Sequence, residues 1–144
     1  MENNSFVGTA TAMNSGTEFT TFINSGQFDF VADEPLSVGG DNLGPAPGDY
    51  LCMALASCKA MTLRMYVRRK QWQVDSINVE VNLVKGDQAE SGLNTFRTDI
   101  LVSGNLTEEQ LKRMQYIAKV CPISRLLVKQ SEVVVTISAK SQGM

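Results

Sequence analysis

Hydrophobic and polar positions along the chain predict strands, a long helix, further strands, two helices and a last strand. Between Phe6 and Val31 the residues are small, polar and β-prone, with phenylalanines as apolar anchors. The turn clusters Asn14-Ser15-Gly16 and Asn24-Ser25-Gly26 divide this region into about three short runs, as hairpin loops do. An N-terminal antiparallel meander is therefore predicted.

An apolar run from about Pro47 to Lys70 predicts one long helix. Proline is accepted in a first helical turn, and Asp49 complements the positive end of the helix dipole. Almost no polar face interrupts the first two-thirds of the run, which is typical of a helix buried on all sides. Lys59 and Arg64 make the run too charged for a membrane span. A chain this short cannot cover such a helix on every side, so a second subunit is predicted.

Two stretches in which apolar and polar residues alternate predict strands, over Val74–Val84 and Phe96–Val102. The next segment, Thr107-Glu108-Glu109-Gln110, has the form of a capping box and precedes a helical apolar stripe. Pro122 ends that helix and is well placed to start another, over Ile123–Val128.

A final strand over Glu132–Ala139 completes the predicted order. No internal repeat, linker or low-complexity segment divides the sequence. The chain has 144 residues, of which 43% are hydrophobic, enough for a core that needs no disulfide or metal. The prediction is one α+β domain over residues 1–144.

The charge of the chain argues against nucleic-acid and membrane partners. Its 13 basic and 15 acidic residues give a net charge of −2, without the basic excess that such partners require. Met1–Ser5 has neither the positive charge nor the apolar core of a secretory signal. We therefore expect a cytoplasmic protein whose cysteines are held reduced.

Candidate chemistry rests on three cysteines, because the chain contains no histidine. This absence removes Ser-His-Asp and Cys-His catalysis and the commonest metal ligand. The cysteine spacings do not match a zinc site, so neither a metal nor another cofactor is predicted. Cys52 precedes Cys58 by six positions, which places it about 120° away around a helix. Cys52 is therefore interpreted as a core residue.

Two of these thiols are candidates for reactivity. At the N-cap of the helix begun by Pro122, Cys121 would face free backbone N–H groups, which would lower its pKa. The alternative is a buried thiol acting as a small apolar residue. Cys58 lies in mid-helix, so its activation would require a cation such as Arg64, Arg125 or an arginine of another subunit.

Four segments in order resemble the OsmC/Ohr family, and the likeness covers nearly the whole chain. They are Gly39–Pro47, Tyr50–Cys58, Met61–Lys70 and Val120–Ser124. The resemblance implies an α+β fold in which two subunits intertwine around paired central helices, with active sites at the subunit interface.

The same resemblance implies a peroxidase that prefers organic hydroperoxides. Cys58 would attack the peroxide, and Cys121 would resolve the product as a disulfide. A dithiol, such as that of a lipoylated protein, would reduce this disulfide. The alternative is a non-catalytic dimer that binds a small apolar or thiol-reactive ligand at the interface.

The sequence departs from the family pattern at two places. Peroxidase members carry an arginine in the N-terminal strands, whereas no arginine or lysine precedes Lys59 here. They also carry a glutamate ten residues before the first cysteine, where this chain has Gly48, and Asp49 is the nearest carboxylate. Candidates for the arginine role are Arg64, Arg97 and Arg125. Arg125 is preferred because it lies within one helical turn of Cys121.

Overall fold

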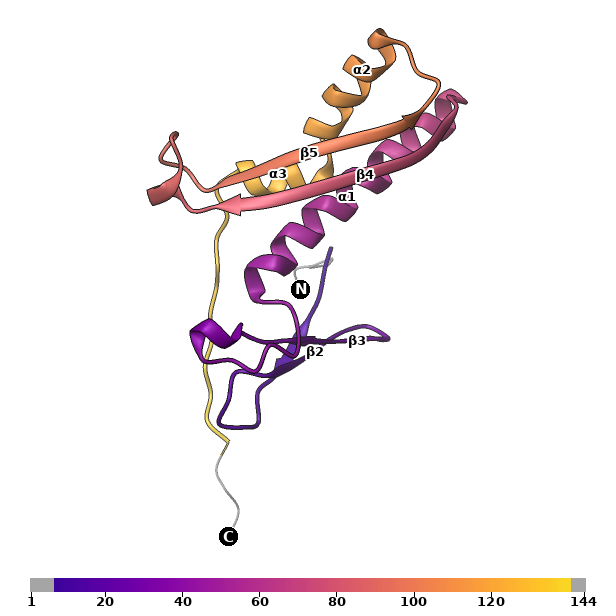
Figure 1. Cartoon of the computed structure of the whole chain (residues 1–144). Helices are drawn as coiled ribbons and strands as arrows, with labels where there is room; N and C mark the ends of the chain where they lie inside the picture. The colour runs from indigo at the N-terminus through magenta and orange to yellow at the C-terminus, as the bar shows by residue number, and fades with distance from the viewer. Residues whose placement is uncertain (1–6, 141–144) are drawn as a thin grey trace, which may run out of the picture. The chain divides into compact units, whose positions relative to one another are not determined.

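The computed structural model describes residues 7–140 and confirms the α+β class. Phe6, where the first strands were expected to begin, and Met1–Ser5 lie outside the described residues. Figure 1 traces the order of elements along the chain. The strands are β1 (Thr11–Met13), β2 (Thr21–Ser25), β3 (Phe28–Ala32), β4 (Val74–Val84) and β5 (Thr95–Gly104). The α-helices are α1 (Pro47–Lys70), α2 (Glu108–Lys119) and α3 (Pro122–Val128), and short 3-10 turns lie at Leu36–Val38 and Gly86–Gln88.

These elements form two compact units. The first contains the residues up to 56 together with 79–99, and the second contains 57–78 together with the residues from 100 onward. Helix α1 and the two-stranded β4–β5 sheet each contribute to both units. Whether the whole chain behaves as one domain therefore stays a prediction.

The first unit contains the predicted meander. Its three strands lie in the order β1-β2-β3 and pair antiparallel, with Phe22 opposite both Met13 and Val31. Gly26 adopts a positive φ of 62° in the β2–β3 turn, which a glycine accepts without steric cost. The first turn of α1 is attached to this sheet, because the Tyr50 hydroxyl donates to the Val31 carbonyl at 2.7 Å.

A buried carboxylate holds the segment that leads from the sheet to α1. Asp33 is 2% exposed and accepts hydrogen bonds from the Thr20 hydroxyl (2.9 Å) and from the backbone N–H groups of Glu34 (2.7 Å) and Leu43 (3.2 Å). Burial by itself raises the pKa of Asp33, but these hydrogen bonds outweigh it and lower the pKa below its usual value.

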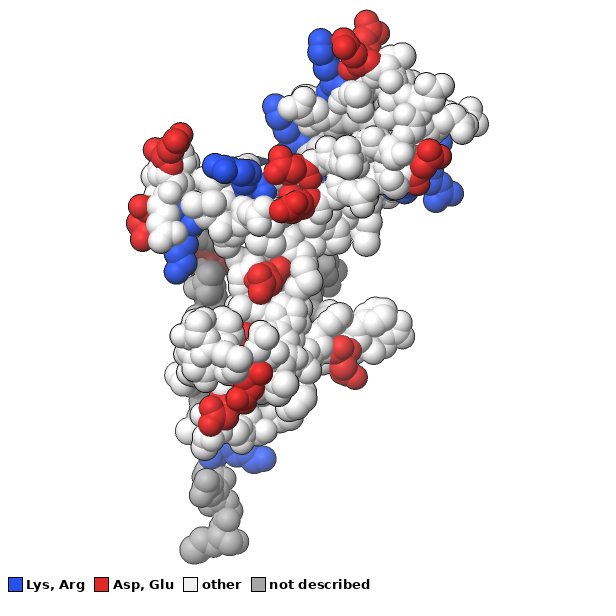
Figure 2. Space-filling model, in the orientation of Figure 1, with Lys and Arg blue, Asp and Glu red and all other residues white. Residues whose placement is uncertain are grey.

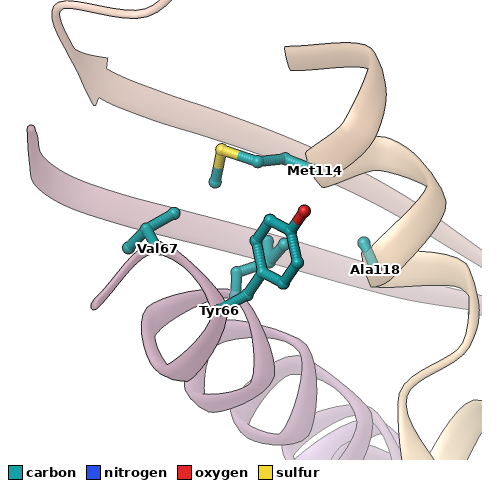
Figure 3. Packing of buried hydrophobic residues seen from close by; sticks show 5 residues of the cluster. Tyr66, Val67, Met114 and Ala118 are labelled. Carbon is teal, nitrogen blue, oxygen red and sulfur yellow. The ribbon is translucent and has the colours of Figure 1, made fainter. Parts of the chain in front are cut away.

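The second unit is built around an apolar core between α1 and α2. Tyr66 and Val67 of α1 face Met114 and Ala118 of α2, as Figure 3 shows, and Leu63 completes this buried cluster. The predicted capping box starts α2: the Thr107 side chain accepts from the Gln110 backbone, and the Gln110 side chain accepts from the Thr107 backbone. Partly buried side chains of α2, β4, β5 and their connections pack against the cluster, namely Trp72, Val74, Ile77, Ile100, Val102, Leu106 and Ile117.

Helix α1 has one buried face and one exposed face in the single chain. Leu55, Lys59 and Leu63, spaced four apart, are buried. Met61 and Met65, also four apart, are 63% and 64% exposed. Burial on all sides, as predicted from the sequence, is thus absent from the single chain.

The predicted final strand over Glu132–Ala139 is wrong for this chain on its own. The residues after α3, up to 140, form no strand, and the apolar side chains among them are exposed by 81% or more. They are Val133, Val134, Val135 and Ile137. A β-strand needs a neighbouring strand to bond its backbone N–H and C=O groups, and this segment has none within the part of the chain that the structure describes.

Candidate functional site

Cys121 begins α3, as the sequence predicts. It occupies the N-cap with an extended backbone (φ −64°, ψ 152°), and Pro122 takes the first helical position. The Cys121 carbonyl accepts from the Arg125 backbone N–H at 3.1 Å. Its side chain is fully buried, and its sulfur lies 3.3 Å from the Ser124 hydroxyl oxygen. The thiol is therefore held between the end of α2 and the first turn of α3.

A lysine that the sequence analysis did not assign to the site reaches the same place. Lys59 is only 7% exposed, and its ammonium group donates to the Ala118 carbonyl at 2.6 Å and to the Ser124 hydroxyl at 2.8 Å. Ala118 is in the last turn of α2, and Ser124 is in the first turn of α3. One side chain from α1 thus links both shorter helices.

These neighbours determine the electrostatics of Cys121. Burial alone raises the pKa of its thiol. The Ser124 hydroxyl and backbone N–H, followed by the positive charge of Lys59, act in the opposite direction and outweigh burial. The pKa of Cys121 consequently lies below the ordinary value for a thiol.

Cys58 joins the site from α1. Its side chain interacts with the Cys121 thiol and is the last of the groups that lower the pKa of that thiol. Cys58 is partly exposed, unlike Cys121. Cys52 is also partly exposed and lies in the other unit. The structure therefore brings together the two cysteines that the resemblance had paired.

The other predicted site residues have different surroundings. The Arg64 guanidinium donates to the backbone carbonyl groups of Val74 (2.8 Å) and Asp75 (3.4 Å). The Asp49 carboxylate accepts from the Ala46 N–H at 3.0 Å in the first turn of α1. The Arg125 side chain is exposed on α3. Catalytic roles for Arg125, Arg64 and Asp49 stay predictions.

The spacing of buried residues in α1 could have revealed Lys59. Leu55, Lys59 and Leu63 recur every four residues, so a helix places them on one face. A lysine in the middle of an apolar face must reach a polar partner, because a buried ammonium group without hydrogen bonds is costly. The sequence could not show that Ser124 and Ala118 would be those partners.

Among residues 7–140 there is no group of three or more cysteine or acidic side chains that could hold a metal ion. The same residues include no helix with the length and apolarity needed to cross a bilayer. Basic and acidic side chains are interspersed on the face that Figure 2 shows. The groups that the structure gathers around Cys121 are a second thiol, a hydroxyl and an ammonium group.

Comparison with known proteins identifies the family. The family model for OsmC-like proteins matches residues 39–138, which include Cys58, Lys59, Cys121 and Ser124. The chain belongs to the OsmC-like family. The resemblance found in the sequence motifs is thereby confirmed. None of the curated proteins shows significant similarity to this OsmC-like chain.

Solved structures share the OsmC-like fold. An OsmC-like protein from Mycoplasma pneumoniae has a TM-score of 0.67 and 20% identity, over 88% of this chain and 89% of its own. An organic hydroperoxide resistance protein from Elizabethkingia anophelis has a TM-score of 0.63 and 20% identity, over 88% and 91%. The organic hydroperoxide resistance protein OhrB of Bacillus subtilis has a TM-score of 0.57 and 22% identity, over 85% and 91%. Similarity at these identities establishes the fold.

Proposed function

We propose that this OsmC-like protein is a thiol peroxidase that reduces organic hydroperoxides with Cys58 and Cys121. The observation that carries the proposal is the interaction of the Cys58 side chain with the Cys121 thiol, which helps to lower the pKa of that thiol. Two thiols in contact can close a disulfide with little movement, and a disulfide protects an oxidised cysteine from further oxidation. Organic hydroperoxide resistance proteins among the similar structures support the substrate class.

Cys58 is the proposed attacking residue because it is the more accessible of the two. Its sulfur attacks the terminal peroxide oxygen, the O–O bond breaks, and the organic fragment leaves as an alcohol after taking up the proton that Cys58 gives up. Cys58 is then a sulfenic acid. The Cys121 thiolate attacks the Cys58 sulfur, the S–S bond forms, and hydroxide leaves and is protonated to water. Two thiols and one hydroperoxide thus yield one disulfide, one alcohol and one water.

Regeneration of the two thiols requires a dithiol reductant. Thiolate attack by such a reductant passes through a mixed disulfide and leaves the reductant oxidised. The dithiol of a lipoylated protein is the reductant that we propose. The cycle suits a reducing compartment such as the cytoplasm, where Cys58 and Cys121 would be returned to thiols.

The proposed functional form is a homodimer. Exposed apolar side chains lie on α1 and in the segment after α3, and both sets would be covered by a second subunit. The segment after α3 would find its missing strand partner in that subunit. The site would then lie where the two subunits meet.

The test is stoichiometric oxidation of the reduced protein. One equivalent of cumene hydroperoxide should consume two thiols per chain, and intact mass should fall by the two hydrogens of one disulfide. Peptide mapping should place that disulfide between Cys58 and Cys121. Unchanged thiols together with a bound, unreacted ligand would refute the peroxidase and support the alternative, a non-catalytic binding protein.

A further inference from the structure

We propose that Lys59 is a positioning residue for Cys121: its ammonium group, acting through the Ser124 hydroxyl, stabilises the Cys121 thiolate. Stabilisation of the thiolate stands on the geometry alone. Its consequence for disulfide closure rests on the proposed peroxidase function.

Lys59 is buried at the site, and its hydrogen-bond partners are neutral. Its ammonium group is buried and donates to two oxygen atoms, the Ala118 carbonyl and the Ser124 hydroxyl. These partners satisfy hydrogen bonds, but neither carries a negative charge. A buried cation is stabilised further by a nearby anion. Cys121 can provide that anion, because its sulfur contacts the same Ser124 hydroxyl.

The Ser124 hydroxyl can bond to Lys59 and to Cys121 at the same time. A serine hydroxyl has one proton to donate and two lone pairs to accept. The Lys59 ammonium group uses one lone pair, at 2.8 Å. When Cys121 is a neutral thiol, it donates to the same oxygen, at 3.3 Å. When Cys121 loses its proton, the hydroxyl can rotate and donate to the sulfur. The Lys59 ammonium group thereby polarises the Ser124 hydroxyl, and the hydroxyl stabilises the thiolate by donating a hydrogen bond to it.

Groups from three helices surround Cys121. Helix α1 contributes Lys59 and Cys58, α2 contributes the Ala118 carbonyl to which Lys59 is bound, and α3 contributes Ser124. Lys59 is the cation among the groups that lower the pKa of Cys121. In the peroxidase cycle, these groups would favour the thiolate form of Cys121 when Cys58 becomes a sulfenic acid. Thiolate attack on that sulfur would then need no prior loss of a proton.

The direct test is a thiolate titration of Cys121 alone. In the Cys52→Ser/Cys58→Ser protein, absorbance at 240 nm follows ionisation even for a buried sulfur, and the serine at position 58 keeps a hydroxyl donor. We expect a midpoint below the value of about 8.5 for a free thiol. Lys59→Gln keeps donor groups but removes the charge, so it should move the midpoint upward and reduce the thiolate fraction near neutral pH at least about threefold. Lys119→Gln removes an exposed charge from the last turn of α2 and should leave the titration unchanged.

Ser124→Ala provides a second variant that keeps Lys59. It should also move the midpoint upward, because the group between the ammonium and the sulfur is lost. If Lys59→Gln does not fold, by circular dichroism, Ser124→Ala decides the question. Titration curves that coincide with the parent curve in the folded variants would overturn the proposal.

The rate of disulfide closure tests whether Lys59 contributes to the proposed peroxidase cycle. With all three cysteines present, Lys59→Gln should close the disulfide more slowly after one equivalent of cumene hydroperoxide, and dimedone should trap more sulfenic acid at Cys58. The pH dependence of closure should shift in the same direction as the titration. If no sulfenic acid forms in the wild-type protein, the peroxidase function fails, whereas the titration still judges the role of Lys59.

Discussion

The Lys59 ammonium nitrogen lies 2.8 Å from the Ser124 hydroxyl oxygen, although 65 residues separate them in the chain. The contact joins the middle of α1 to the first turn of α3, beside the Cys121 sulfur. It explains how a cysteine that is fully buried can still have a lowered pKa. The positive group is provided from within α1, the helix that also contains Cys58.

Single cysteine variants should separate the two roles in the proposed cycle. Cys58→Ser should abolish hydroperoxide consumption, because the attacking sulfur is gone. Cys121→Ser should allow one stoichiometric turnover and then accumulate sulfenic or sulfinic acid at Cys58, because no thiol remains to close the disulfide. Consumption of cumene hydroperoxide and intact mass measure these outcomes.

Cys52→Ser is the matched control for these variants, since it removes a thiol from the same helix. It should keep full turnover and affect only stability. If Cys58→Ser and Cys121→Ser lose the first turnover equally, the assignment of attacking and resolving thiols does not hold.

The lowered pKa of Cys121 predicts a pH-dependent contribution to stability. The folded-state pKa lies below the unfolded-state value, so the folded protein binds fewer protons in the window between them. The contribution is fully present above the unfolded-state pKa of about 8.5 and is lost as the pH falls through the folded-state value. The free energy of unfolding of the wild type, relative to Cys121→Ser, should therefore be greater at about pH 9 than at about pH 6.

Urea unfolding under reducing conditions measures this difference. Cys52→Ser again serves as the control. The difference in stability between the wild type and Cys52→Ser should not follow the pH dependence expected for Cys121→Ser. A wild-type advantage over Cys121→Ser that is the same at both pH values would contradict the prediction.

The lowered pKa of Asp33 predicts that the stability of the fold also depends on pH in the acid range. Its pKa is lowered by the hydrogen bonds that it accepts, so its contribution is present above the usual carboxyl pKa of about 3.9 and disappears as the pH falls through the lower folded-state value. Asp33→Asn places an amide where N–H groups donate, so it should lower the thermal midpoint at neutral pH. That deficit should shrink toward pH 3. Asp29→Asn, within β3 and in an exposed position, should cause little change.

Much of the fold was predictable because the deciding information is local. The turn clusters define the meander, alternation defines β4 over Val74–Val84, and the capping box defines the start of α2. The placement of Cys121 at the N-cap before Pro122 was predictable for the same reason.

The rest depends on contacts that are remote in sequence. The role of Lys59 needs the α2–α3 corner to lie against α1, and no pattern within α1 specifies that corner. The strand predicted over Glu132–Ala139 has suitable residues, yet a strand also needs a partner, which alternation cannot provide. Arg125 was preferred as the cation for Cys58 because it is close to Cys121 in sequence, and that role stays a prediction. The cation that lowers the pKa of Cys121 is Lys59, which lies 62 positions earlier in the chain.

Two glycines near the start of α1 should respond oppositely to alanine. A Cβ at Gly44 would collide with the Val31 backbone carbonyl, whereas a Cβ at Gly48 meets nothing within 4 Å. Gly44→Ala should therefore lower the free energy of unfolding by about 1–3 kcal/mol, as overpacking does. Gly48→Ala should raise it by up to about 1 kcal/mol, since alanine favours a helix. Urea titration measures both, and equal effects would show that the close approach at Gly44 is not maintained in solution.

The exposed side of α1 predicts an obligate homodimer. Met61 and Met65 are each more than 60% exposed in the single chain, and an exposed apolar helix face is typical of a protein–protein interface. We expect a dimer that buries well over about 2,000 Å², the range of permanent interfaces. Met61→Glu should weaken it, because a carboxylate would be buried without a partner. Glu109→Gln on the first turn of α2 removes an exposed charge and should leave the dimer intact. Sedimentation velocity at micromolar concentration measures both variants, and a stable folded wild-type monomer would refute the prediction.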